Sequence, residues 1–236
     1  YALFRHNARL IIRTASSAIT GSHPIALQEL RRRGIKKAQA NGIIYEESTD
    51  MTAFWKILEE VLAEKHHRTP VHTLTEIERL RASFPDKIRL FVARKDDTII
   101  AGTLIYETDK VAHAQYIASS DDGRAMGALD GLFDHLITQV YATKSYFDFG
   151  ISTEQGGRYL NEGLIFQKEG FGGRAVCYDS YRVELNRTNL QKMSSSAEKD
   201  ERVRNVKFLD LKAINESFEP DLSRAVMHAL HSGWYL

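Results

Sequence analysis

Five consecutive segments constrain the fold of this 236-residue chain more than any other feature. Three apolar segments, Ile88–Arg94, Thr98–Tyr106 and Val111–Ser119, are separated by short polar turns, which predicts antiparallel neighbours in one sheet. Apolar residues at helical spacing from Leu129 to Val140 predict a helix, and a strand follows at Tyr146–Ile151. A helix that connects two parallel strands of one sheet makes a right-handed crossover. The sequence therefore predicts an α/β fold with a mixed sheet.

Further elements are expected on both sides of these five segments. The pattern predicts a strand before them, two amphipathic helices after that strand, and a helix and a final β segment at the other end. Their ranges are Ile43–Glu47, Asp50–His66, Thr75–Phe84, Gly157–Lys168 and Arg174–Leu185. The expected order along the chain is β-α-α-β-β-β-α-β-α-β.

The first 42 residues differ from the rest in charge. They carry eight Lys or Arg residues against one Glu, a net charge of +7, although the whole chain has a net charge of only +1. We expect a strand at Arg9–Thr14 and a basic helix from Pro24 to Ala40, which Asn41 and Gly42 end. Such a segment could contact phosphate groups, or it could be the solvated face of a helix that packs on acidic neighbours.

One segment has the composition of a linker. Residues 186–203 are polar, rich in serine and poor in apolar residues, so we place a domain boundary there. We therefore expect a basic N-terminal segment at residues 1–42, a folded domain at 43–185, and a separate tail at 204–236.

Cysteine and histidine usage argues against several classes of protein. The single cysteine, Cys177, excludes an internal disulfide and is expected to be a buried, inert thiol; we expect a cytoplasmic protein. No apolar stretch approaches the roughly 20 residues that a membrane-spanning helix needs. His66, His67 and His72 lack the spacing of metal ligands, so no metal site is expected.

Two motifs point to a known family. The segment Tyr146–Ile151 reads YFDFGI, and Gly163–Gly173 reads GLIFQKEGFGG. Together with the order of elements, they resemble the GNAT (Gcn5-related N-acetyltransferase) fold, and in particular the second acyltransferase domain of the FemAB family, over about residues 28–186. The resemblance implies an acyltransferase whose fourth and fifth strands splay apart to admit an acyl donor. It also implies that residues 1–42 are the remnant of a preceding GNAT-like half.

A second resemblance lies after the linker. Phe208–Lys212, Ile214–Ser217 and the final Ser232–Leu236 are similar to the first residues of DegT/DnrJ/EryC1-type sugar aminotransferases. The similar segment is short and lacks the lysine that binds pyridoxal phosphate in that family. It implies a fused or neighbouring aminotransferase as a partner. An unrelated amphipathic tail that packs on the domain is the alternative.

The acyl donor is expected at the start of the long helix. Free backbone N–H groups and the positive end of the helix dipole suit a pyrophosphate there, and acetyl-CoA is the expected donor. Arg124 and Gly127 match the first half of the family's Q/R-x-x-G-x-G/A signature, but position 129 is Leu. Alternatively, Asp121 or Asp122 caps the helix. The candidate donor-binding residues are Ser119, Ser120, Gly123, Arg124 and Gly127.

Acyl transfer to an amine also needs a base and a group that polarises the carbonyl. By the resemblance, Lys168 stabilises the developing oxyanion. His113, Tyr116 and Glu154 are candidates for the base, and strict alternation along the strand places His113 and Tyr116 on opposite faces. The candidate substrate contacts are Phe166 and Tyr181.

These observations leave three hypotheses. The first is an acetyl-CoA-dependent N-acetyltransferase that acts on the amine of a sugar nucleotide or another cell-envelope precursor in polysaccharide biosynthesis. The second is a FemAB-like aminoacyltransferase that uses aminoacyl-tRNA and acts on a peptidoglycan precursor. The third is a GNAT-like module that binds a ligand without catalysis. In each, the expected partner is a small molecule, tRNA enters only with the second, and no membrane span is expected.

Overall fold

The computed structural model describes residues 8–21, 25–183, 224 and 227, and these residues belong to two compact units. The larger unit is Thr14–Tyr178, and the other comprises residues 1–13 and 179–236. In the smaller unit, the Arg13 guanidinium pairs with the Asp179 carboxylate at 2.7 Å. The predicted linker and nearly all of the predicted tail lie outside the described residues.

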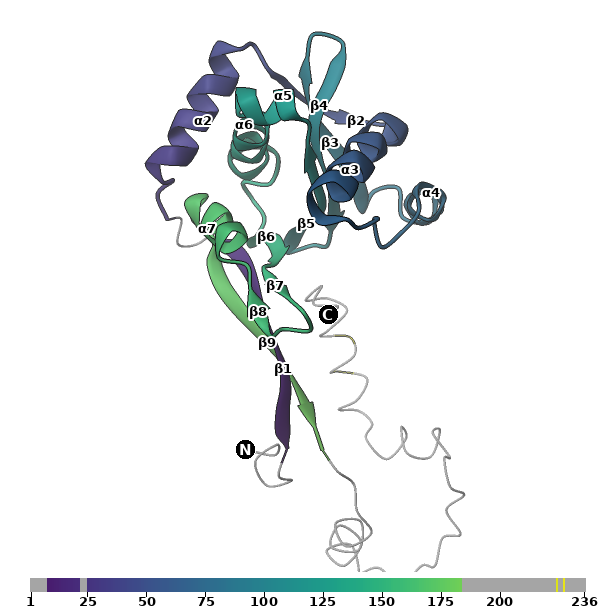
Figure 1. Ribbon diagram of the computed structural model, residues 1–236, viewed down its shortest axis with the longest axis vertical. Helices are drawn as coiled ribbons and strands as arrows, with labels where there is room; N and C mark the ends of the chain where they lie inside the picture. Colours follow the sequence, from purple (N-terminus) through teal and green to yellow (C-terminus); the bar gives the residue numbers. More distant parts are fainter. Residues whose placement is uncertain (1–7, 22–24, 184–223, 225–226, 228–236) are drawn as a thin grey trace, which may run out of the picture. The chain divides into compact units, whose positions relative to one another are not determined.

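A seven-stranded sheet in the order β2-β3-β4-β5-β6-β1-β9 is the framework of the fold (Figure 1). The pairs β2–β3, β3–β4, β4–β5 and β1–β6 are antiparallel, whereas β5 and β6 run parallel. The predicted mixed α/β fold is thereby confirmed, with the helical crossover between β5 and β6. The strands are β1 Arg9–Thr20, β2 Ile44–Ser48, β3 Ile88–Lys95, β4 Thr98–Glu107, β5 Val111–Ser119, β6 Tyr146–Ile151 and β9 Arg174–Arg182.

The helices begin where the sequence offers caps. The Asp50 side chain accepts a hydrogen bond from the Ala53 N–H, and Thr73 and Glu76 form a capping box. The predicted single helix at 129–140 is instead α6 followed by a π-helical turn, Leu136–Val140, and it is preceded by the separate short helix α5. The α-helices are α2 Glu29–Ala40, α3 Met51–His66, α4 Leu74–Ser83, α5 Asp121–Met126, α6 Ala128–His135 and α7 Glu162–Gly170.

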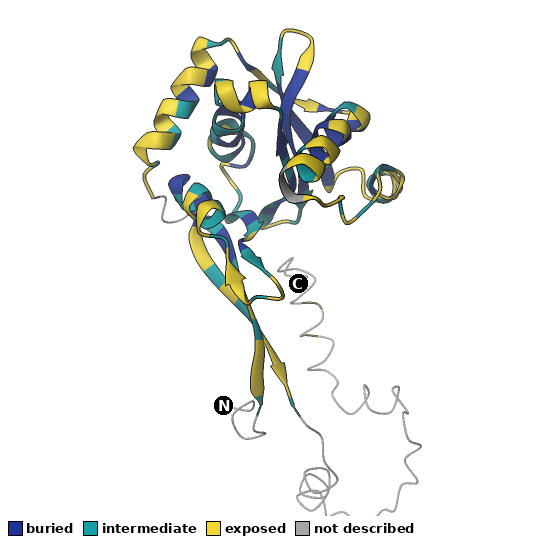
Figure 2. Ribbon diagram, viewed as in Figure 1, coloured by how far each residue is buried: buried dark blue, intermediate teal, exposed yellow. Residues whose placement is uncertain are grey.

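Two apolar cores cover the sheet (Figure 2). One core joins α6 to β6 through Leu132, Phe133 and Phe147, and the other includes Phe54 and Trp55 of α3. Because apolar residues alternate along a strand, each face of the sheet presents side chains to one of the cores. The polar residues of the candidate site therefore come from strands whose other side chains are fixed in the cores.

The expected boundary at residue 42 falls inside the larger unit. Strand β1 continues to Thr20 and pairs with β6, with Ala18 opposite Asp148. Helix α2 contacts α6, where Arg31 forms an ion pair with Asp130. Residues 14–20 of β1 and helix α2 are thus part of the larger unit, which sequence periodicity alone could not show because these contacts are long-range.

Two local expectations are corrected near the end of the domain. Residues 157–160 are not helical, because β7 (Thr153–Glu154) and β8 (Tyr159–Leu160) form a small hairpin. Helix α7 begins only after Asn161, whose side chain accepts from the Leu164 N–H. Cys177 is exposed rather than buried, since β9 is an edge strand with few buried residues.

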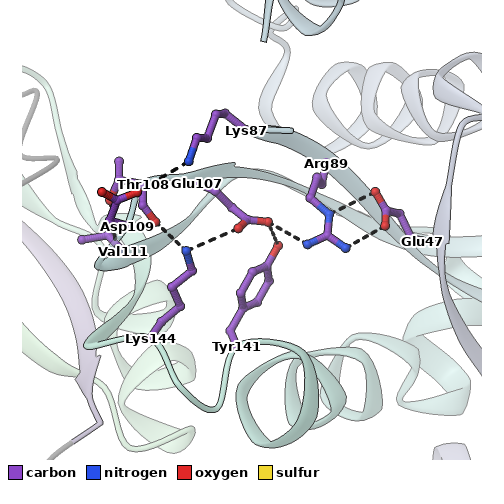
Figure 3. Close-up of polar contacts among 9 residues, drawn as sticks. All are labelled: Glu47, Lys87, Arg89, Glu107, Thr108, Asp109, Val111, Tyr141 and Lys144. Carbon is purple, nitrogen blue, oxygen red and sulfur yellow. Dashed lines mark hydrogen bonds and ion pairs between the residues drawn. The ribbon is translucent and has the colours of Figure 1, made fainter. Parts of the chain in front are cut away.

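A network of charged and polar groups links three strands to the end of the π-helical turn (Figure 3). Arg89 on β3 donates to Glu47 on β2 and to Glu107 on β4, the latter at 3.0 Å. The buried Tyr141 hydroxyl donates to the same Glu107 oxygen at 2.6 Å. Lys144 lies 3.5 Å from the other Glu107 oxygen. Glu107 therefore holds the end of the crossover against the sheet.

We expect Glu107→Gln to lower the free energy of unfolding by about 3 kcal/mol, because Arg89 and Lys144 lose a mostly buried partner. Tyr141→Phe, which removes one hydrogen bond, should cost about 1 kcal/mol. Urea denaturation measures both. Asp109→Asn is the control, since the Asp109 side chain is 77% exposed and pairs with Lys87 at 3.6 Å. An equal loss in this control would contradict the central role of Glu107.

Candidate active site

The candidate site lies where β5 and β6 stop pairing. Their parallel register covers three positions, and its last pair is His113 with Asp148. Beyond this pair β5 continues to Ser119 and β6 to Ile151. This is the splay that the family resemblance implies.

His113 and Asp148 form a hydrogen-bonded pair at this point. His113 Nδ1 lies 2.6 Å from Asp148 Oδ2. The other carboxylate oxygen accepts from the Ser16 hydroxyl at 2.6 Å and from the Gly150 N–H at 3.1 Å. Burial works to raise the pKa of Asp148, but the hydrogen bonds from His113 and Ser16 outweigh it and the pKa is lowered. Asp148 is therefore a carboxylate that orients the His113 ring.

A β-bulge changes which side chains share the His113 face. Tyr116 pairs with Leu104 and Ala114 with Ile105, so Gln115 is the extra residue of β5. The bulge places Tyr116 in the core beneath α3, away from the core that holds Ala112 and Ala114. The expectation that His113 and Tyr116 face opposite ways is therefore wrong, because strict alternation ends at the bulge.

Gln115 and Tyr116 continue the polar contacts from His113. His113 Nε2 lies 3.0 Å from the Gln115 side-chain oxygen, and the Tyr116 hydroxyl lies 2.6 Å from His72 Nδ1. Burial raises the pKa of Tyr116, although hydrogen bonds with His72 and Gln115 act in the opposite direction. Tyr116 is thus a neutral phenol at neutral pH and contacts His72.

Lys168 is buried rather than solvated at a helix end. Lys168 lies on α7 and is 4% exposed. Its Nζ donates to the carbonyl oxygens of Gly150 at 2.9 Å and Ile151 at 2.7 Å. Burial lowers the pKa of Lys168 to about 8, and the charge of Asp148 opposes that change. The lysine remains largely protonated at neutral pH and lies within electrostatic reach of Asp148.

Three other predicted site residues have separate surroundings. Glu154 accepts a hydrogen bond from the Asn161 side chain at 2.8 Å, which ties the β7–β8 hairpin to the start of α7. Phe166 on α7 is largely exposed. Tyr181 belongs to the smaller unit, where its hydroxyl donates to Asp179 at 3.1 Å. None of these contacts involves His113.

The expected donor loop makes many contacts within the protein. Ser120, not Asp121 or Asp122, caps α5: its hydroxyl accepts from the Gly123 N–H and donates to the Ile100 carbonyl. The Arg124 guanidinium donates to the Ser119 carbonyl and to the Asp121 carboxylate. These contacts give Ser120 and Arg124 a structural role within the protein. Their role in donor binding stays a prediction.

Gly127 has a packing reason to be glycine. Its φ is 73°, in the left-handed region, and a Cβ atom would lie 2.4 Å from the Gly34 carbonyl oxygen of α2. The residue ends α5 and begins α6, so a side chain here would disturb the contact between α2 and the crossover. The glycine of the partial signature is therefore needed even without a ligand.

The described residues hold no group of three or more His, Cys, Asp or Glu side chains arranged to bind a metal ion. In the same part of the chain, no helix is long and apolar enough to cross a membrane. An open hollow of about 520 Å³ lies at the end of α3, lined by Ala63, His67, Arg68 and Thr69. His72, which contacts Tyr116, follows this hollow in the chain.

Sequence reasoning missed Asp148, Ser16 and Gln115 as parts of the site. Asp148 could have been predicted from the sequence, because it lies between Phe147 and Phe149 in a strand. These two residues are buried, so Asp148 must face away from their core. Ser16 offered no such signal, because it reaches Asp148 only through the pairing of β1 with β6.

The acetyltransferase (GNAT) domain family matches residues 28–159, more than half of the chain. The chain belongs to this family. It is accordingly an acyltransferase of GNAT type, as its sequence motifs predict. No curated protein sequence matches the chain.

Several solved structures share the fold. FemX superposes with a TM-score of 0.57 and 12% identity over 76% of this chain, and this chain covers 63% of FemX, less than two thirds. The C-terminal domain of a protein named as a lysylphosphatidylglycerol synthetase from Agrobacterium fabrum gives 0.56 and 16%, over 87% of this chain and 70% of that domain. L-PGS from Bacillus licheniformis gives 0.56 and 14%, over 83% and 68%. The resemblance to a FemAB-type domain is thus confirmed at the level of the fold.

We expect the burial of Lys168 to make stability depend on pH. Lys168 has its ordinary pKa of 10.5 in the unfolded chain and a pKa of about 8 in the folded chain. Between pH 8 and pH 10.5 the unfolded state therefore binds more protons than the folded state. Raising the pH from 8 to 10.5 should therefore increase the contribution of Lys168 to the free energy of unfolding. Urea denaturation of the wild type and of Lys168→Met across this range measures the difference. A difference that does not vary with pH would contradict the burial of a charged lysine.

Proposed function

We propose that the chain is an N-acyltransferase in which His113 is the general base and Asp148 holds its ring. The hydrogen-bonded His113–Asp148 pair at the splay of β5 and β6 carries the proposal. A carboxylate on Nδ1 fixes the tautomer in which Nε2 accepts a proton. In the free protein Nε2 lies 3.0 Å from the Gln115 side-chain oxygen, which can only accept a hydrogen bond. The incoming amine displaces this oxygen, and Nε2 acts as the base in its unprotonated form.

The reaction can be written with each proton assigned. The amine nitrogen of the acceptor attacks the acyl carbon of an acyl-CoA, and His113 Nε2 takes the proton that the nitrogen loses. The new C–N bond forms as the C–S bond breaks, and the imidazolium returns its proton to the departing thiolate. Asp148, which has a lowered pKa, stays ionised and stabilises the imidazolium.

The finer parts of the proposal concern the donor and the acceptor. Acetyl-CoA is the proposed donor because the GNAT domain family generally uses acyl-CoA, and the acyl group enters between β5 and β6. The proposed acceptor is the amine of a sugar nucleotide or another cell-envelope precursor. It is supported by the resemblance of residues 204–236 to a sugar aminotransferase, which would supply that amine.

We expect His113→Ala to lower kcat about 100-fold or more, because a positioned base contributes at least that much. Asp148→Asn should also lower kcat. The neutral amide lacks the negative charge that stabilises the imidazolium, and it does not select one tautomer of His113. Release of free thiol from acetyl-CoA in the presence of an amino-sugar nucleotide measures both effects.

His135→Ala is the matched control, because His135 lies on α6 and stacks on Tyr45. It should keep the wild-type rate. Full activity of His113→Ala would contradict the role of His113 as the base. A lack of acyl-CoA binding by calorimetry would contradict acyl-CoA as the donor.

A second candidate function has its own observation. Helix α2 exposes Arg32, Arg33, Lys36 and Lys37, which recur at the spacing of one helix face. A row of exposed cations suits a polyanion such as tRNA, so an aminoacyl-tRNA donor is the alternative to acyl-CoA.

If this alternative holds, the double variant Arg33→Glu/Lys36→Glu should weaken tRNA binding at least tenfold, and the wild-type affinity should fall steeply with added salt. Filter binding at several salt concentrations measures this. Absence of tRNA binding at low salt would dismiss the alternative and leave acyl-CoA as the donor.

A further inference from the structure

The bonds of Lys168 suggest a role other than contact with the reacting atoms. An ammonium group has three N–H donors, and two of those on Lys168 are committed to the main-chain carbonyls of Gly150 and Ile151. The residue is 4% exposed. A buried charge is normally hydrogen-bonded or paired, because an unpartnered one costs much free energy. Here the partners of the charge are carbonyl groups of the last residues of β6.

The end of β6 needs such support. Its register with β5 ends at Asp148, and its register with β1 is irregular: Ser16 pairs with Ile151 and Ala18 with Asp148, so β6 holds one extra residue between these pairs. Gly150 has a φ of 76°, in the left-handed region. Carbonyl groups that leave a regular ladder require new partners, and Lys168 provides them.

The same short segment supports the His113–Asp148 pair. The Gly150 N–H donates to Asp148 Oδ1 at 3.1 Å. A Cβ atom on Gly150 would lie 3.4 Å from Cε1 of His113, so the ring of His113 rests against this backbone. Any shift of Gly150 would therefore move both members of the pair.

We propose that Lys168 is a positioning residue: by binding the carbonyls of Gly150 and Ile151, it fixes the end of β6 on which the His113–Asp148 pair rests. The inference deepens the proposed function and rests on it for its catalytic consequence. It assigns to Lys168 a structural contact with β6 in place of direct stabilisation of the oxyanion.

Two variants of the full chain test this proposal from opposite sides. Lys168→Gln removes the charge and one donor, whereas Gly150→Ala keeps Lys168 and disturbs the backbone that it binds. Lys56→Gln is the matched control, since Lys56 is exposed on α3. The readouts are kcat and KM, the low-field proton NMR signal of the His113–Asp148 hydrogen bond, and hydrogen exchange of the Gly150 N–H.

We expect both variants to lower kcat about 100-fold, the effect of misplacing a catalytic group by about 1 Å, while KM changes little. Both should also broaden or abolish the low-field signal and speed the exchange of the Gly150 N–H. Lys168→Arg, which retains charged donors, should restore part of the signal and of kcat. Lys56→Gln should match the wild type.

A low kcat in Lys168→Gln with a wild-type NMR signal and wild-type exchange would overturn the proposal and favour direct contact with the oxyanion. If Lys168→Gln does not fold, Gly150→Ala decides: wild-type kcat and signal in that variant would equally overturn it. Failure of the proposed function is a different result, namely no acyl transfer by the wild type. In that case the low-field NMR signal and the hydrogen exchange of the Gly150 N–H would still test the contact between Lys168 and β6.

Discussion

The separation of β5 from β6 is the constraint on which the rest of the site depends. Up to His113 and Asp148 the two strands share a parallel ladder, and beyond this pair each needs other partners for its backbone groups. On β6 these partners are the Lys168 ammonium and strand β1. On β5 the bulge at Gln115 turns Tyr116 toward α3. The separation of the two strands is thus accompanied by specific interactions on both sides.

The charged groups around Glu107 and those around Asp148 have different kinds of partner. Around Glu107, the cations Arg89 and Lys144 meet carboxylates, and the contacts fix the crossover to the sheet. Around Asp148, one carboxylate is shared by His113, Ser16 and the Gly150 N–H, and the nearby cation is bound by carbonyls. The first arrangement satisfies its charges within itself. In the second, the other imidazole nitrogen of His113 contacts the Gln115 side-chain oxygen at 3.0 Å.

Local patterns in the sequence predicted the fold class well, because the five segments from β3 to β6 have strong periodicity and short connections. His113 and Lys168 could also be found from the sequence, one by its place in a strand and the other by a motif. Asp148 was within reach for a similar reason, as a polar residue between two buried phenylalanines. Ser16 and His72 were not, because each meets its partner through contacts between segments distant in the chain.

The sequence by itself determined the mixed α/β class, the crossover between β5 and β6, and membership of a GNAT-type family, since these depend on local periodicity and short motifs. Only the tertiary structure decided which groups meet. It placed β1 beside β6, turned Tyr116 to the face of His113, and gave the Lys168 ammonium to the carbonyls of Gly150 and Ile151. The physical reason is that a bulge breaks the two-residue alternation of a strand, and that pairing between segments distant in the chain leaves no trace in local sequence patterns.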